Sequence, residues 1–195
     1  MKKILTLVFA LFIGMNLINA QEETLIDDLR FTGGFGAPIL EFSEINGQLT
    51  ADIGGGGALV LNNFFLGGYG MGTSFPEYDL DDESYDIRFK HGGLWMGYVQ
   101  KPYKLVHFYS SLKIGWGKTK LLLEKDAQYT DNIMSIIPEI GIELNVTKFM
   151  HIGFTGGYRL VSGVSKLPGL ENEDFSSPVG VITFRFGGFS GMDDW

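Results

Sequence analysis

The sequence lacks cysteine altogether, and it lacks a surplus of positive charge. Without cysteine there is no disulfide framework, no thiolate chemistry and no lipid-attachment cysteine behind an export signal. The 15 basic residues stand against 23 acidic residues, which gives a net charge of −8. Nucleic-acid-binding proteins need a basic face, so the composition argues against nucleic acid as a partner.

Two sequence patterns that would indicate other folds are also missing. No glycine run has the spacing of a phosphate-binding loop that opens a helix, which excludes that kind of nucleotide site. No helical pattern follows the first twenty residues. The 28 glycines are about twice the usual share, and runs of them such as 54–57, 92–93 and 156–157 fall inside apolar alternating segments. Glycine in a strand marks a bend or a close approach of backbones, which a small, tightly coiled barrel needs.

The first twenty residues predict an export signal that is removed. Lys2 and Lys3 give a positive start, residues 4–13 are apolar, and Ala20 offers a small residue before the cut. This apolar stretch is short for a membrane-spanning helix, so we favour the signal over an anchor. Without the two lysines, 13 basic residues remain against 23 acidic ones, a net charge of −10. The expected domains are a signal peptide (1–20), an N-terminal periplasmic segment (21–29), a barrel (30–189) and a C-terminal tail (190–195).

Roughly eight segments between residues 31 and 189 place an apolar residue at every second position, which is the signature of β-strands. In residues 106–116 one face holds Val106, Phe108, Leu112, Ile114 and Trp116, and the other holds His107, Tyr109, Ser111, Lys113 and Gly115. Short turns are expected at 62–63, 101–102 and 147–148, and long polar connections at about 75–84, 119–131 and 165–177. Short turns alternating with long loops are typical of outer-membrane β-barrels, whose short turns are periplasmic.

The length of these segments separates a membrane barrel from a soluble β-domain. Many run ten or more residues, enough to cross a bilayer at a tilt, whereas soluble strands average five or six. A soluble periplasmic β-barrel that binds a ligand is the alternative. Aromatic residues near the segment ends would form two interfacial girdles. They are Phe64, Phe65, Tyr98, Tyr103 and Phe149 by the short turns, and Phe75, Tyr85, Trp116 and Tyr129 by the long loops.

The closing strand, residues 178–186, reads Pro-Val-Gly-Val-Ile-Thr-Phe-Arg-Phe. Over residues 30–189 the chain resembles the small eight-stranded outer-membrane β-barrels, the group that includes OmpX and the OmpA membrane domain. The resemblance is one of pattern rather than motif. It implies an all-β, antiparallel, up-and-down transmembrane barrel in the bacterial outer membrane, reached by export through the periplasm. The implied partners are outer-membrane lipids and the assembly machinery, which reads a closing strand of this kind.

An eight-stranded barrel is just wide enough for side chains to fill its interior. Alternation places charges of both signs on the expected inward face, and they should pair because an unpaired buried charge is costly. A narrow, porin-like path for small or apolar molecules is the alternative. The predicted structural ion-pair network consists of Arg88, Lys113, Glu139, Glu143, Arg159 and Arg185, with Asp52 and Lys90 on the same face. If the loop near Asp126 turns symmetrically, Lys113 lies opposite Glu139.

The histidines raise the question of a metal site or a catalytic site. His107, Glu143 and His151 could share one inner wall, and two imidazoles with a carboxylate can bind a divalent metal. Hydrogen bonding in the lumen is the favoured role for them, so no metal or other cofactor is predicted. The nearby pair His107 and Ser110 alternates onto opposite faces, which makes a poor dyad. We therefore predict no catalytic residues and no enzyme activity.

Much of the acidic charge lies in the expected long loops. Such charge runs are usually solvated, and the alternative is cation bridging to calcium or to anionic surface lipids. The predicted function is a structural or surface-interaction barrel that works through its outer loops, with a possible surface partner there. The alternative is a transport barrel. The acidic loop residues are Glu77, Asp79, Asp81, Asp82, Glu83 and Asp86, and then Glu171, Glu173 and Asp174.

Overall fold

The computed structural model describes residues 30–73, 77–80, 83–123 and 126–189. The expected signal peptide (1–20), periplasmic segment (21–29) and tail (190–195) lie outside these residues, as do Phe75, Asp81 and Asp82. Among the described residues, no helix is long and apolar enough to cross a membrane. The strands and one short 3-10 turn are β1 (Phe31–Ile45), β2 (Gln48–Leu61), β3 (Phe64–Thr73), β4 (Glu77–Leu80), β5 (Glu83–Gln100), β6 (Val106–Leu123), β7 (Asp126–Asn145), β8 (Met150–Ser162), η1 (Glu173–Phe175) and β9 (Ser177–Phe189).

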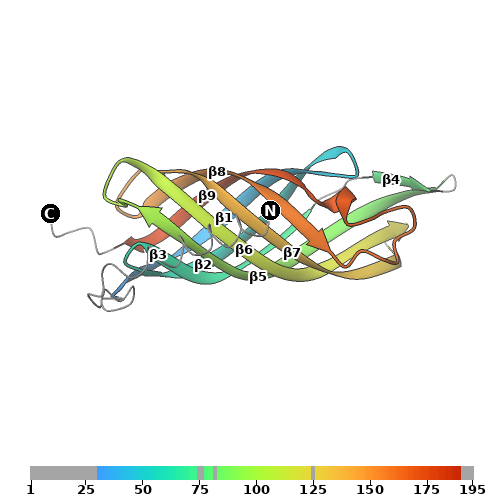
Figure 1. The fold of residues 1–195 in the computed structure, drawn as a ribbon, viewed down its shortest axis with the longest axis horizontal. Helices are drawn as coiled ribbons and strands as arrows, with labels where there is room; N and C mark the ends of the chain where they lie inside the picture. Colours follow the sequence, from blue (N-terminus) through green and yellow to red (C-terminus); the bar gives the residue numbers. More distant parts are fainter. Residues whose placement is uncertain (1–29, 74–76, 81–82, 124–125, 190–195) are drawn as a thin grey trace, which may run out of the picture. The chain divides into compact units, whose positions relative to one another are not determined.

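These strands form one closed antiparallel sheet (Figure 1). Apart from β3 and β4, each strand pairs with the next one in the chain, and β1 closes the barrel by pairing with β9. Both β3 and β4 pair with β5, so together they occupy a single position around the barrel. The predicted eight-stranded antiparallel barrel is therefore confirmed.

The two ends of the barrel differ in their connections. The predicted turns at 62–63, 101–102 and 147–148 all lie at one end, the short-turn end, where β1 begins and β9 finishes. The opposite end, the loop end, carries residues 163–176 together with β4 and η1 (Figure 1). It also carries a tight turn at Asn46-Gly47, with φ of 49° and 72°. The dipeptide Asn-Gly is the strongest short hairpin signal, and it identifies this turn from sequence.

Two of the three predicted long connections are wrong. Residues 75–84 include β4 and the start of β5, and residues 119–131 include the end of β6 and the start of β7. Both regions are extensions of hairpins whose strands keep pairing beyond the apolar part of the wall. Residues 165–177 do form a long connection, which contains η1.

The outer wall carries an apolar belt. On β6 the outward residues from Val106 to Trp116 are exposed or half-exposed, a stretch of the length that crosses a bilayer at a tilt. Of the predicted girdle residues, Phe65 and Tyr85 are buried inside the barrel, so their assignment is wrong. The exposed members are Phe64, Tyr103 and Phe149 at the short-turn end and Trp116 and Tyr129 toward the loop end.

At the loop end, beyond the apolar belt, the outer face of the wall carries charged side chains and the inner face carries apolar ones. On β5 the inward residues Ile87 and Phe89 are buried, whereas Arg88 and Lys90 are exposed on the outer wall. The predicted place of Arg88 in the lumen network is therefore wrong, as is the inward placement of Lys90. Where strands rise above the bilayer into water, apolar side chains turn inward as they do in a soluble barrel. The inward cluster there is Ile45, Tyr85, Ile87, Phe89, Leu121, Ile133, Val161, Val164, Leu167, Leu170 and Phe175.

Inward glycines make room for large aromatic rings in the other half of the barrel. A Cβ added to Gly97 would collide with the ring of Phe65, and one added to Gly115 would collide with the hydroxyl of Tyr69. Small residues facing large ones are a usual way to fill a small barrel. The aromatic residues packed there include Phe35, Phe65, Tyr69, Trp95 and Tyr109.

Candidate functional site

Five charged side chains form a layer across the lumen, the central charged belt, between the two inward apolar clusters. Lys113 comes from β6, Glu139 from β7, Arg159 from β8, Glu41 from β1 and Asp52 from β2, and all five are buried. Lys113 Nζ lies 2.5 Å from Glu139 Oε1. Arg159 Nη1 lies 2.7 Å from Asp52 Oδ2 and 3.2 Å from Glu41 Oε1. Glu41 joins the two groups, because its Oε2 lies 4.0 Å from Lys113 Nζ.

The register that produces this belt differs by two residues from the expected one. Lys113 pairs with Ile137 on the neighbouring strand, and it is Ser111 that pairs with Glu139. Lys113 therefore reaches Glu139 diagonally along the inner face. β6 ends at Leu123 and β7 begins at Asp126, so the centre of the hairpin lies one or two residues before Asp126.

Uncharged partners complete the hydrogen bonding of this belt. Glu139 accepts hydrogen bonds from Ser111 Oγ at 2.9 Å and from Thr155 Oγ1 at 3.1 Å. The Thr73 hydroxyl donates to Asp52. Arg159 donates from Nε to the Phe175 carbonyl oxygen at 2.9 Å, which links the belt to the loop end. Buried charges with this many partners form a rigid plug rather than a solvated channel wall.

Glu41 is not among the predicted lumen charges, although it is fully buried. The signal that identifies it is local. It lies between the outward residues Leu40 and Phe42, and two positions after the buried Ile39. Pro38, exposed on the outer wall, stands in the same strand and obscures this alternation.

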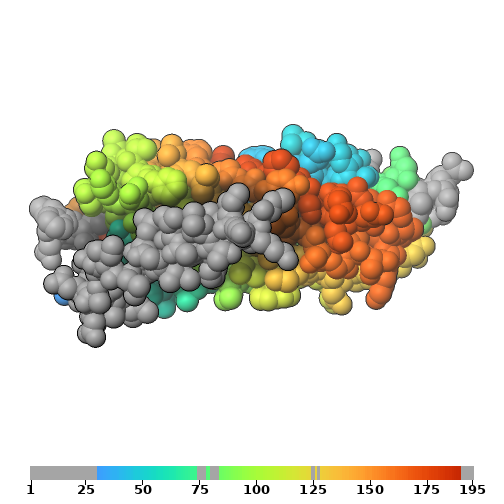
Figure 2. All heavy atoms as spheres, viewed as in Figure 1, coloured from blue at the N-terminus to red at the C-terminus, as the bar shows by residue number. Residues whose placement is uncertain are grey.

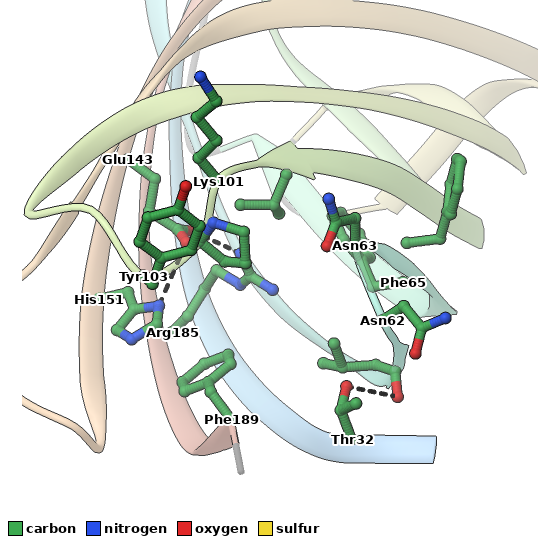
Figure 3. Close-up of a pocket in the computed structure, with 14 residues that line it drawn as sticks. Thr32, Asn62, Asn63, Phe65, Lys101, Tyr103, Glu143, His151, Arg185 and Phe189 are labelled. Carbon is green, nitrogen blue, oxygen red and sulfur yellow. Dashed lines mark hydrogen bonds and ion pairs between the residues drawn. The ribbon is translucent and has the colours of Figure 1, made fainter. Parts of the chain in front are cut away.

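A second ionic cluster lies at the short-turn end and is centred on Glu143. His107 Nε2 and His151 Nδ1 each lie 3.1 Å from Glu143 Oε1. Arg185 Nη1 lies 2.5 Å from Glu143 Oε2. The three residues His107, Glu143 and His151 thus come together on one inner wall, and Figure 3 shows Glu143, His151 and Arg185 facing one another.

Arg185 makes this cluster an unfavourable place for a metal ion. Its guanidinium occupies the second oxygen of Glu143, and its positive charge would oppose a bound cation. In the part of the chain that the structure describes, no group of three or more histidine, aspartate or glutamate residues has the geometry of a metal site. We therefore interpret the cluster as a hydrogen-bonded structural unit.

Aromatic rings hold Arg185 in place. Its guanidinium carbon lies 3.8 Å from the ring centre of Phe35 and 5.0 Å from that of Phe65. The ring of His151, another member of the cluster, stacks on the ring of Phe189, with ring centres 3.9 Å apart. Cation–π contacts of a desolvated arginine are worth up to about 2 kcal/mol each. The cluster is thus supported by packing as well as by charge.

A cavity of about 320 Å³ opens at the short-turn end (Figure 3). Asn62, Asn63 and Tyr103 of the turns line it, and Glu143 and Arg185 lie at its inner limit. None of the five residues of the central charged belt lines it. The cavity is therefore a vestibule that ends at the second ionic cluster.

The nearby histidine and serine do not form a catalytic pair. Ser110 is half-buried on the outer side of β6, and its hydroxyl lies 3.5 Å from the Tyr98 carbonyl oxygen. His107 points inward to Glu143, with Nδ1 2.9 Å from the Lys104 carbonyl oxygen. The two side chains have separate partners on opposite faces of the wall.

At the loop end, Asp131 of β7 holds the long loop (residues 163–176) by hydrogen bonds. Its carboxylate accepts hydrogen bonds from the backbone N–H groups of Ser165, Lys166 and Leu167 at 2.8, 2.7 and 3.2 Å. Figure 2 shows this loop (orange to red) as a thick layer at the same end of the barrel as β4. Burial alone would raise the pKa of Asp131, but the three N–H groups outweigh it and hold that pKa below its ordinary value.

We expect Asp131→Asn to loosen the loop. At pH 7 the amides of residues 165–167 should exchange hydrogen about tenfold faster than in the wild type, because charge-assisted hydrogen bonds are about twice as strong as neutral ones. Since the folded pKa is depressed, this stabilisation is present above the unfolded pKa of about 3.9 and is lost as pH falls through the folded value. Hydrogen exchange, corrected for intrinsic rates, measures both effects.

The matched control for this prediction is Asp79→Asn, which neutralises an exposed carboxylate at the same end of the barrel. It should leave exchange at residues 165–167 unchanged. Equal exchange rates for the wild type and Asp131→Asn at pH 7 would contradict the role assigned to Asp131.

Among known proteins, the matches to this chain are solved structures. No protein-family model matches the sequence, and no curated protein matches it. Neisserial surface protein A (NspA) is similar over 80% of this chain and 96% of its own, with 9% identity and a TM-score of 0.56. Ail, the attachment invasion locus protein of Yersinia pestis, matches over 81% of this chain and 97% of its own, with 16% identity and a TM-score of 0.46. At such identities the likeness to NspA concerns the fold alone.

Proposed function

We propose that this chain, whose fold is that of the small outer-membrane β-barrels, is an integral protein of the bacterial outer membrane with a lumen closed by its own side chains. Its role is structural or surface-interacting, through the external loop end. The observation that carries the proposal is the inverted distribution of polarity across the wall in the middle of the barrel.

Apolar side chains face outward there and charged ones face inward. Leu59, Ile140 and Leu160 are 58%, 65% and 51% exposed, whereas Lys113 and Arg159 are 0% exposed. Soluble proteins rarely expose a continuous apolar band, because each exposed apolar surface costs free energy in water. A hydrocarbon bilayer removes that cost, and strands of this length cross it. The same band argues against a soluble periplasmic barrel that binds a ligand.

The connections give the orientation. Short turns of outer-membrane barrels are periplasmic and longer loops are external. The short-turn end therefore faces the periplasm, and residues 163–176 face the outside of the cell. The exposed acidic residues Glu171 and Glu173 on that loop are available to a surface partner. The closing strand β9, at the barrel seam with β1, is the segment that we expect the assembly machinery to read.

We expect neither catalysis nor free passage of solutes in the lumen. The vestibule at the short-turn end favours the transport alternative, but the Glu143 cluster and the central charged belt lie between it and the loop end. We expect no enzyme activity, because His107 and Ser110 lie on opposite faces of the wall.

Localisation and orientation are tested together in intact cells. Since the chain has no cysteine, single cysteines can be introduced without background. A cysteine at Glu171 should react with an impermeant thiol reagent, whereas one at Lys104, exposed on a turn at the short-turn end, should react only after the outer membrane is opened. The reverse pattern would invert the orientation. Recovery of the protein in the soluble periplasmic fraction would refute the proposal.

A further inference from the structure

Four cationic residues stand side by side on the outer wall near the loop end. Arg88 and Lys90 on β5 pair directly with Lys120 and Lys118 on β6. Arg88, Lys90 and Lys118 are exposed, and Lys120 is half-exposed. Like charges placed directly opposite each other on neighbouring strands destabilise a sheet. This concentration of positive charge is unusual in a chain whose net charge is −8.

The residues paired directly with this basic cluster on β3 and β7 carry no charge. On β3 its neighbour is Gly72, which pairs with Lys90, and on β7 its neighbours are Asn132 and Thr130, which pair with Lys118 and Lys120. Asp86 occupies the next outward position of β5 beyond Arg88. Between described residues, none of the four cations forms an ion pair.

The wall beside the basic cluster is hollowed into an open groove. Gly70 and Gly72 of β3 form its floor, Lys90 and Lys118 stand at its charged side, and Ile53 and Trp116 give it apolar edges. Gly72 lies under Lys90, since a Cβ there would be 3.1 Å from Lys90 Cγ. The Lys90 stem thus covers Gly72, whereas a Cβ added to Gly70 would meet nothing within 4 Å, so the open space for a bound group lies over Gly70, beside the ammonium ions.

The position of the groove along the wall relates it to the membrane surface. Trp116, which is 56% exposed, lies one outward position below Lys118 on β6. Exposed tryptophan marks the level of lipid headgroups. Below it, toward the short-turn end, the outward residues Leu94 and Ile114 are apolar. Phosphate would thus meet the cations while an attached acyl chain continues along the apolar belt.

We propose that this groove binds the phosphate-bearing headgroup of a lipid in the outer leaflet, with Arg88, Lys90, Lys118 and Lys120 contacting the phosphate. Lysine and arginine form strong charge-assisted hydrogen bonds to phosphate. A bound dianion would also offset the repulsion between the opposed cations. The inference rests on the outer-membrane placement proposed above, and the apolar continuation below Trp116 favours a lipid over free phosphate.

The test uses the full chain, folded in uncharged detergent micelles, with phosphatidic acid as the probe. Wild-type protein should bind phosphatidic acid and not phosphatidylcholine. Lys90→Gln combined with Lys118→Gln should weaken binding about thirty-fold, because each cation near a lipid surface is worth about 1 kcal/mol. Lys101→Gln with Lys104→Gln removes the same charge from the short-turn end and should leave binding unchanged. Heat-modifiable gel mobility checks that each variant is folded.

Three results would overturn this lipid site. They are equal weakening by both double variants, equal binding of phosphatidylcholine, and displacement of phosphatidic acid by inorganic phosphate at the same concentration. The last would indicate a free-anion site instead. Because binding is measured in micelles, these failures are separate from a failure of the outer-membrane proposal, which cell fractionation and cysteine labelling decide.

Discussion

Arg159→Met is expected to lower the free energy of unfolding of the barrel by about 4 kcal/mol, because it removes one partner from a buried ionic network. Arg159 is 0% exposed, and it ties β8 to β1 and β2 through Glu41 and Asp52. Methionine fills a similar volume but leaves both carboxylates without their guanidinium partner. Lys113 would then be the one cation left in the central belt, facing three carboxylates.

The loss of Arg159 should also weaken the link between the lumen and the loop end. Its Nε donates to the Phe175 carbonyl oxygen, and its Nη2 donates to the Glu44 carbonyl oxygen at 3.2 Å. Urea titration of the protein folded in lipid vesicles measures the change. Lys104→Met is the control, because it removes an exposed cation from a turn at the short-turn end. An equal loss of stability in both variants would contradict the assignment of Arg159 to a buried network.

Glu139→Ala should lower the free energy of unfolding by about 3 kcal/mol, because truncating one partner of a buried ion pair leaves the other charge poorly compensated. Among the described residues, the Lys113 ammonium would keep Glu41, at 4.0 Å, as its one ion-pair partner. Ser111 and Thr155 would lose the acceptor of their hydroxyl groups. The effect is smaller than that of Arg159→Met, since the belt would still hold two cations and two carboxylates.

The control for Glu139→Ala is Asp79→Ala on β4. Asp79 is exposed, so water and salt already screen its charge and its removal should cost far less. The same urea titration distinguishes the two. If Glu139→Ala unfolded at the same urea concentration as the wild type, the lumen charge would not be a paired, stabilising group.

Sequence alternation is sufficient to place Lys113 and Arg159 on strands that cross the bilayer. Lys113 lies between Leu112 and Ile114, and Arg159 lies between Tyr158 and Leu160. Because the apolar neighbours suit lipid, the charged residue must face the lumen. The pairing of Lys113 with Glu139 then follows from adjacent strands, even though the exact register depends on where the hairpin turns.

The same alternation is ambiguous where a strand leaves the bilayer. Residues 86–90 read Asp-Ile-Arg-Phe-Lys, which alternates as regularly as the membrane segments. In water, Ile87 and Phe89 turn inward and Arg88 and Lys90 turn outward. Whether the charged or the apolar residues of such a segment face inward depends on how far β5 rises above the apolar belt. That height is set by strand tilt and stagger, which depend on the whole barrel and not on local sequence.

Aromatic residues are ambiguous for a related reason. Phe65 and Trp95 suit either a lipid interface or a packed lumen, and both are buried inside the barrel. Their inward placement depends on small residues that lie against them on other strands: Gly97, which pairs directly with Phe65, and Gly56 beside Trp95. These contacts join residues that are distant in the sequence, so the pattern of one strand does not reveal them.

The central claim is that the lumen is a packed ionic core and not a pore, and planar-bilayer recording of the wild-type protein tests it most directly. Lys113, Glu139 and Arg159 are buried and bonded across the middle of the barrel. We expect a silent membrane or rare, small conductance events after insertion. Steady, reproducible channels of nanosiemens size would contradict the packed lumen and favour the transport alternative.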